Sequence, residues 1–268
     1  MRIKRIKGLP GENRAVILVW LFPALALISA GAALVSQYLA AQVFGWTSTV
    51  YRERREFALV EYISLSSADI PLEVYVWDGD KIILDYVGET GLVIDEGEFE
   101  LKISRDEDFA FSLFSSDALN YKMRVWLPNV TYRDIKLVTA SGDISADSVK
   151  TGILTATSRA GDINLYGVDG IIALNTRYGN ISAEFTEFKY ICGTETETGN
   201  ISVLMPEDSG VKLDFLTDSG RFSSDFFLRE YRNYQGDLYL SEGSSPVRFT
   251  VRTSTGNLDF CKVIEYIY

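Results

Sequence analysis

Residues 135–149, IKLVTASGDISADSV, begin a pattern that returns in residues 153–170, ILTATSRAGDINLYGVDG. In each stretch a small residue, a glycine, a polar residue and an apolar residue follow one another. The same motif recurs along the chain: SGDI at Ser141, AGDI at Ala160, YGNI at Tyr178, TGNI at Thr198, SGRF at Ser219 and TGNL at Thr255. Its glycines are 19, 18, 20, 21 and 36 residues apart, and the last spacing is close to two periods. A fixed period near 20 residues is typical of a solenoid.

Aligning these six units on the glycine produces columns of like residues. The residues seven before and two after the glycine are always apolar, and the residue three before it always carries a hydroxyl. Apolar residues occupy odd offsets before the glycine and even offsets after it, which indicates a strand on either side of a corner. We expect glycine to adopt a positive φ at that corner. The prediction is an all-β fold, a parallel β-solenoid or β-helix-like stack of ~20-residue repeats.

Two polar columns admit both a structural and a ligand-binding interpretation. The hydroxyl column is expected to fill a narrow interior and to bond along the stack, and the alternative is a row that reads a ligand. The second column holds Asp143, Asp162, Asn180, Asn200 and Asn257. Turn chemistry explains it, and the alternative is a calcium ladder. Calcium-binding β-rolls have denser repeats with several carboxylates per turn, and Arg221 interrupts this column. We therefore predict no metal site.

The sequence on either side of the clear repeats is less regular. Residues 59–130 alternate in the manner of strands, and we expect the strand around Leu72 to form a hairpin with the strand around Leu84 through Asp78-Gly79. Because a solenoid needs an atypical unit over its open end, this region is predicted to be a cap. Residues 226–246 break the repeat and are either a divergent rung or an inserted loop. Their tyrosines, at positions 231, 234 and 239, either form a contact patch or pack locally.

The N-terminal region has the composition of a membrane anchor. Residues 15–41, AVILVWLFPALALISAGAALVSQYLAA, contain no charge. As a helix they would extend roughly 40 Å, enough to cross an apolar core about 30 Å thick. Five basic residues precede the segment and favour a cytoplasmic N-terminus, although Arg52, Arg54 and Arg55 after it weaken that argument. A cleaved signal peptide is the alternative.

Composition excludes several classes of function. The formal charge is -11, and residues 1–14 hold five of the 26 basic but only one of the 37 acidic residues. Such an acidic remainder does not favour nucleic acid. The chain has no histidine, which excludes Ser-His-Asp and Cys-His catalysis. Asp106, Glu107 and Asp108 are consecutive and indicate a solvated turn. Cys192 and Cys261 fall in columns that face opposite ways, so we expect free thiols.

The strand YKMRVWLP, followed by IKLVTASGDISADSV and ILTATSRAGDINLYGVDG, resembles the bacterial putative-adhesin family of β-strand-repeat domains, a domain of unknown function. The resemblance covers roughly residues 60–268. It implies a short N-terminal helical anchor with an outer β-solenoid, and some members of that family sit beside regulators of envelope stress. It supplies no catalytic residues, so we assign no catalytic, cofactor-binding or metal-binding residues and no cofactor.

These observations predict a single-pass protein of the cell membrane with an extracellular C-terminal domain. Its expected parts are a cytoplasmic tail (1–14), a transmembrane helix (15–41), a juxtamembrane linker (42–58), a β cap (59–134) and the Gly-corner repeats (135–268). The predicted function is a non-catalytic, adhesin-like interaction module with a protein, cell-wall or glycan partner, or with itself. The alternative is an accessory or sensor of an envelope stress response. A polysaccharide-active β-helix enzyme is the third hypothesis and the one least supported.

Overall fold

The structure is a computed structural model that describes residues 50–89, 91–105, 121–226, 229–232, 238–242 and 247–262. The chain divides into two compact units, Met1–Ser48 and Thr49–Tyr268, and the described residues all belong to the second. These residues contain no helix long and apolar enough to cross a membrane. The predicted tail 1–14 and membrane segment 15–41 lie outside the described residues.

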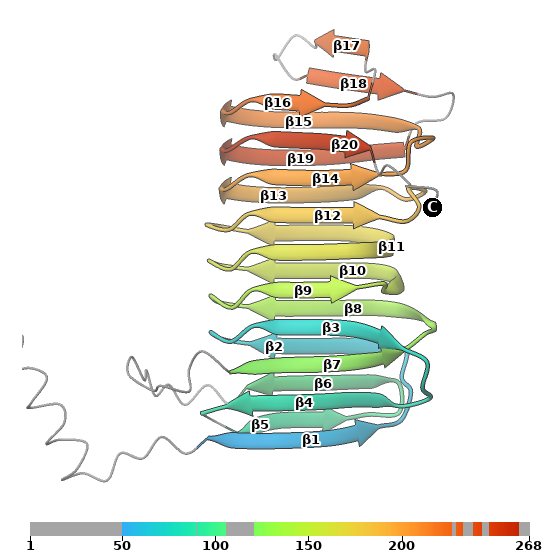
Figure 1. Cartoon of the computed structure of the whole chain (residues 1–268), viewed down its shortest axis with the longest axis vertical. Coiled ribbons are helices and arrows are strands. Elements are labelled where there is room, and N and C mark those ends of the chain that lie inside the picture. The colour runs from blue at the N-terminus through green and yellow to red at the C-terminus, as the bar shows by residue number, and fades with distance from the viewer. Residues whose placement is uncertain are drawn as a thin grey trace, which may run out of the picture. The chain divides into compact units, whose positions relative to one another are not determined.

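The described residues form two mixed β-sheets that stack strand upon strand (Figure 1). In spatial order, sheet A contains β1 (Tyr51–Phe57), β4 (Ile82–Gly88), β7 (Lys122–Pro128), β3 (Leu72–Trp77), β9 (Ile144–Asp147), the first part of β11 (Ile163–Thr176), β12 (Ile181–Phe185), β14 (Ile201–Met205), β20 (Leu258–Lys262) and β16 (Phe222–Ser224). Sheet B contains β5 (Leu92–Glu96), β6 (Glu100–Arg105), β2 (Tyr62–Ser67), β8 (Thr131–Thr139), β10 (Lys150–Ser158), the second part of β11, β13 (Cys192–Thr198), β19 (Val247–Thr255), β15 (Val211–Ser219), β18 (Leu238–Glu242) and β17 (Arg229–Arg232).

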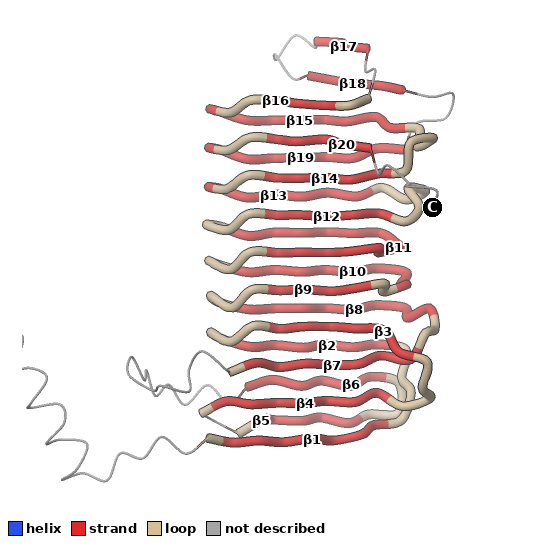
Figure 2. Tube along the Cα trace, in the orientation of Figure 1, coloured by secondary structure: helices blue, strands red, loops and turns tan. Residues whose placement is uncertain are grey.

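Each repeat forms one rung, which we define as a strand of sheet B joined through a corner to a strand of sheet A. Neighbouring rungs pair in parallel and in register, so that Leu154 lies opposite Ile172 in sheet B and Ile163 lies opposite Ile181 in sheet A. The corners lie along one edge of the stack (Figure 2). The predicted stack of β-strand repeats is confirmed, because like columns face each other across consecutive rungs.

The predicted inward columns form the core between the two sheets. All the residues seven before the glycine are buried, and of those two after it only Phe222 is partly exposed. Burying large aliphatic side chains stabilises a protein by about 1.5–3 kcal/mol each, so a repeated column contributes at every rung. Nearly all the buried apolar residues belong to one continuous cluster.

The corner glycines do not adopt a positive φ, and this part of the prediction is wrong. Positive φ occurs at Gly167 and Gly170, inside β11 where the chain passes from sheet A to sheet B. The corner glycines are required by close approach instead. A Cβ on Gly199 would lie 2.0 Å from the carbonyl oxygen of Gly179, and one on Gly161 would lie 2.1 Å from that of Gly142. The corners stack so tightly that only a hydrogen fits between them.

The rungs do not follow one another in sequence order. The last rung, β19–β20, lies between β13–β14 and β15–β16, since β19 pairs with both β13 and β15. Segment 226–246 is neither an aligned rung nor a simple loop. Its described residues form an antiparallel hairpin, β17–β18, that adds to β15 at the end of sheet B.

The region expected to be a cap contains a seventh rung. Strands β2 and β3 carry Ile63, Leu65, Ser67 and Leu72 in the repeat columns, with Ile70 in place of the glycine. This rung lies between β8–β9 and β6–β7. The hairpin expected between residues 72–76 and 82–86 is therefore wrong, because β3 pairs in parallel with β7 and β9.

The remaining N-terminal strands close that end of the stack with antiparallel pairs. Strands β5 and β6 form a hairpin, and β4 pairs with both β7 and β1. Residues 51–57, which fall in the expected linker, form β1, the outermost strand of sheet A on this side. The charged sequence of this edge strand, YRERREF, disfavours pairing with another chain.

Candidate functional site

The hydroxyl column serves the stack itself. Thr176 Oγ1 donates to the carbonyl oxygen of Gly161 at 3.0 Å, and Thr196 Oγ1 donates to that of Gly179 at the same distance. Each bond therefore joins a side chain to the corner of the preceding rung. Because both side chains are almost fully buried, this column is not available to a ligand. The structural interpretation of the hydroxyl column is confirmed.

The Asp/Asn column forms a second ladder on the outside of the corners. Each side-chain oxygen accepts a hydrogen bond from the backbone N–H at the same position of the next rung, as between Asp143 and Asp162 at 2.8 Å and between Asn180 and Asn200 at 2.9 Å. The ladder continues through Asn257 and ends at the backbone N–H of Arg221. These oxygens satisfy corner N–H groups, which is the turn chemistry that the sequence predicts.

The other residues that the sequence singled out either lie outside the described residues or are placed by their backbone alone. Asp106, Glu107, Asp108 and Tyr234 lie outside the described residues. The backbones of Tyr231 and Tyr239 are opposite one another in the β17–β18 hairpin. Within the described ranges, no group of three Asp, Glu, Cys or His residues is placed to hold a metal ion.

Both cysteines are free thiols, as expected. Cys192 is buried in the inward column, and burial raises the pKa of its thiol to about 11. At neutral pH this thiol is therefore protonated and a poor nucleophile. Cys261 is partly exposed beside Asp225, and burial followed by the charge of Asp225 also raises its thiol pKa.

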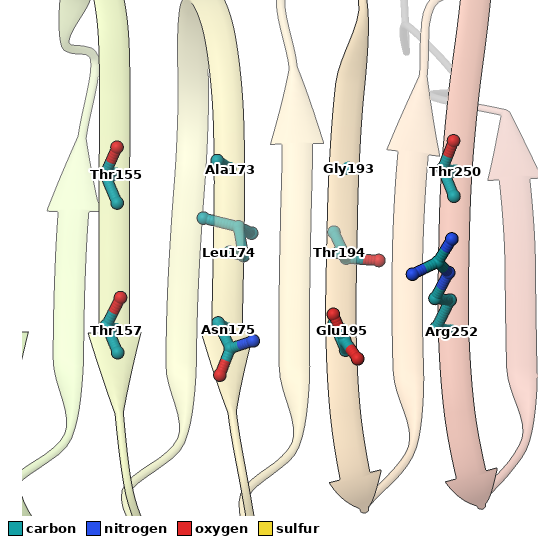
Figure 3. Close-up of a pocket in the computed structure, with 10 residues that line it drawn as sticks. All are labelled: Thr155, Thr157, Ala173, Leu174, Asn175, Gly193, Thr194, Glu195, Thr250 and Arg252. Atoms are coloured by element: carbon teal, nitrogen blue, oxygen red, sulfur yellow. The ribbon is translucent and has the colours of Figure 1, made fainter.

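The feature that the structural columns do not explain is a groove on the outer face of sheet B. It has a volume of about 360 Å³ and crosses strands β10, β11, β13 and β19 (Figure 3). Its floor is the row of outward residues Thr155, Ala173, Gly193 and Thr250, which lie opposite one another in adjacent strands. Small side chains at four consecutive strands therefore make a trough that runs along the stack.

The two sides of the trough differ in chemistry. One side is polar and consists of Thr157, Asn175, Glu195 and Arg252. Beyond the floor on the opposite side, outside the residues that line the groove itself, lies an outward row that holds three isoleucines. Ile153 and Ile171 lie opposite one another and are each 41% exposed, and Ile191 precedes Cys192 in the same outward position and is 65% exposed. Exposed isoleucines in a row are uncommon on a soluble surface and favour a contact surface.

The electrostatics of the trough are balanced. Glu195 and Arg252 are opposite one another on adjacent strands and are both exposed, and Figure 3 shows Arg252 reaching along β19 towards Thr250. The floor row continues to Lys136 on one side and to Asp214 on the other. Asp214 forms an ion pair with Arg248 at 2.6 Å. The centre of the face is thus nearly uncharged within a strongly acidic chain.

Gly193 is the residue of the trough that folding does not require. Its φ is not positive, and a Cβ at this position would meet only the carbonyl oxygen of Thr250 at 3.7 Å, an ordinary contact. A glycine inside a strand costs stability and often marks a close approach by another molecule. The repeat pattern did not predict this position, because the repeat is defined by inward columns and Gly193 occupies an outward position of its strand.

Comparison with known proteins agrees with the architecture. The family model described as Toastrack DUF4097 matches residues 123–260, which is just over half of the chain. The protein belongs to this Toastrack family. The resemblance stated from the sequence is thereby confirmed at the level of the family. A search of curated proteins finds no match.

Solved structures resemble the Toastrack chain in fold. One is described as a putative cell adhesion protein from Clostridium sporogenes ATCC 15579, which is 13% identical and has a TM-score of 0.51, with 80% of this chain and 100% of that chain covered. Another is a putative adhesin from Bacteroides fragilis NCTC 9343, 12% identical, with a TM-score of 0.40 and coverages of 81% and 98%. At such identity the first likeness supports a shared fold and nothing finer.

Proposed function

We propose that this Toastrack protein is a membrane-anchored, extracytoplasmic interaction module of the cell envelope that carries out no catalysis. Its contact surface is the outer face of sheet B. The observation that carries the proposal is the contrast between the bonded polar columns of the corners and the outer face of sheet B. Most hydroxyls of the repeated Thr column and the oxygens of the Asp/Asn column are bonded within the stack, whereas the outer face of sheet B holds exposed isoleucines beside a trough whose Gly193 the fold does not require.

The sequence of the N-terminal region supports the anchoring part of this proposal. The uncharged segment 15–41 precedes the described strands by a few residues, so an uncleaved helix there would hold the stack at the membrane surface. Five basic residues before the segment favour a cytoplasmic N-terminus. The fold shared with a protein described as a putative cell adhesion protein is compatible with a surface role.

Co-sedimentation with isolated cell envelopes tests the proposal. The full chain, kept in a detergent without a sugar headgroup, should sediment with envelopes. Ile171→Glu should weaken binding at least tenfold, because it places a charge among the exposed isoleucines beside the trough. The matched control is Ser202→Glu, on the outer face of sheet A, and it should bind as the wild type does. Absence of wild-type binding would refute the proposed function.

The alternative role, as an accessory to an envelope stress sensor, makes a different prediction. In that case the identity of residues 15–41 should matter more than the trough. Replacing this segment with an unrelated apolar helix should abolish the protein's effect on the envelope stress response and leave its binding to envelopes intact. Our proposal predicts that an unrelated anchor supports both.

A further inference from the structure

We infer that the trough on sheet B binds a linear, uncharged polysaccharide segment that lies along the stack, across the strands. This inference rests on the proposed function and names the chemical class of its partner. It depends on four properties of the trough: its size, the absence of free backbone groups, the mixture of polar groups along one side, and the missing side chain at Gly193.

The size of the trough suits a slender ligand. Its volume of about 360 Å³ lies at the lower end of the 300–1,000 Å³ typical of small-ligand sites. Four adjacent strands spaced about 4.8 Å apart give a floor roughly 14 Å long. A second copy of the chain would need an interface of about 800 Å² on each side, which is several times the area of this floor. The trough alone therefore does not account for a stable dimer.

The position of the trough disfavours an extended peptide. Peptides that bind sheets usually add a strand at a free edge and use its backbone N–H and C=O groups. Strands β10, β11, β13 and β19 each have a hydrogen-bonded neighbour on both sides. A peptide that lay across their face would find no free backbone N–H or C=O groups to bond with. A polymer that is recognised through side chains does not need such groups.

The polar side of the trough suits hydroxyl groups. Thr157 donates and accepts, Asn175 does both through its amide, Glu195 accepts and Arg252 donates. Sugar hydroxyls also donate and accept, so they can bond with every member of this row. The exposed isoleucines of the outward row beside the floor can pack against the C–H faces of the rings. The opposite charges of Glu195 and Arg252 cancel, so the trough itself has little net charge. The chain as a whole has a formal charge of -11 and would repel an anionic polymer, which favours an uncharged one.

Gly193 gives the ligand access to the floor. It lies between Ala173 and Thr250 in the floor row, and a side chain at this position would rise into the trough. Nothing in the backbone conformation or in the neighbouring atoms demands a glycine. We therefore expect a larger residue here to block binding without harming the fold.

Titration with soluble oligosaccharides tests the inference directly. The probes are cellotetraose and maltotetraose, with a trigalacturonate as the charged comparison, added to the full chain in a detergent without a sugar headgroup. We expect at least one neutral probe to bind and the charged one to bind at least tenfold more weakly. Gly193→Ile should reduce neutral binding at least tenfold, and Ser182→Ile on the outer face of sheet A should not change it. Binding of none of the neutral probes, or equal binding by Gly193→Ile, would overturn the inference.

Treatment of envelopes separates this inference from the proposed function. Periodate oxidation, which cleaves sugar rings that carry adjacent hydroxyls, should abolish co-sedimentation of the full chain, while protease digestion of the envelopes should leave it unchanged. If protease abolishes binding and periodate does not, the partner is a protein: the inference fails and the interaction module stands. If wild-type protein binds no envelope in either state, the proposed function itself fails.

Discussion

The backbone N–H of Arg221 donates a hydrogen bond to the Asn257 side-chain oxygen at 2.9 Å, although the two residues lie 36 positions apart. The bond places the rung of Gly220 beyond the rung of Gly256, at the end of the Asp/Asn ladder. This position explains the arginine that interrupts the column. Every earlier residue of the ladder accepts a bond from the next rung and therefore needs a side-chain oxygen. Among the described residues no further N–H follows Arg221 in the ladder, so this position needs no acceptor.

Substitutions at these two residues should differ in effect. Asn257→Ala removes the acceptor for the Arg221 N–H and should lower the free energy of unfolding by about 1 kcal/mol. Arg221→Ala removes no acceptor and should change it by less than about 0.5 kcal/mol. Chemical denaturation of the two variants measures both values. Equal losses would contradict the order of the rungs.

The corner glycines should tolerate no side chain. Gly199→Ala brings a Cβ to 2.0 Å from the backbone oxygen of Gly179, and separating two stacked corners should cost about 3 kcal/mol. Gly91 is the matched control, because a Cβ there would have no neighbour within 4 Å. Gly91→Ala should be close to neutral in the same thermal or urea unfolding experiment. A neutral Gly199→Ala would show that the corners are looser than described.

Substitution of Thr194 should raise the free energy of unfolding instead of lowering it. Its side chain is 3% exposed and its hydroxyl has no hydrogen-bond partner among the residues that the structure describes, while Leu174 and Val251 lie on either side in the same column. Thr194→Val should therefore raise the free energy of unfolding by about 1–3 kcal/mol, because it removes an unsatisfied buried polar group. Thr196→Val, which removes a bonded hydroxyl, should lower it. Loss of stability in the first variant would mean that the hydroxyl is satisfied.

Periodicity predicted the columns but not the order of the rungs. The spacing of Ile144, Ile163 and Ile181 defines which face of each strand is buried, because burial on one face is a local property of alternation. The neighbours of a rung depend on contacts between distant segments, and similar rungs compete for the same place. The rung of β2 and β3 was not predicted, because Ile70 stands where the other rungs have the glycine of the motif. The trough was not predicted from the sequence, because its outward residues do not repeat one residue type from rung to rung.

The order of the rungs has a consequence for the C-terminal end of the stack. Strand β19 joins β13 to β15, so in a chain that ends at residue 246 nothing connects β15 and its β17–β18 hairpin to the rest of sheet B. Limited trypsin digestion should then cleave rapidly at Lys212, while the rungs from β2 to β14 remain protected. A chain that ends at residue 262 keeps β19 and β20 and serves as the control. Continued protection of Lys212 in the shorter chain would contradict the insertion of the last rung.

The most direct test of the proposed contact surface is hydroxyl-radical footprinting of the full chain with and without isolated envelopes. Ile153, Ile171 and Ile191 are exposed on sheet B, and Tyr166 is 46% exposed near the end of the sheet A part of β11. The account predicts that envelopes reduce oxidation of the three isoleucines severalfold and leave Tyr166 unchanged. Protection of Tyr166 with continued oxidation of the isoleucines would contradict it.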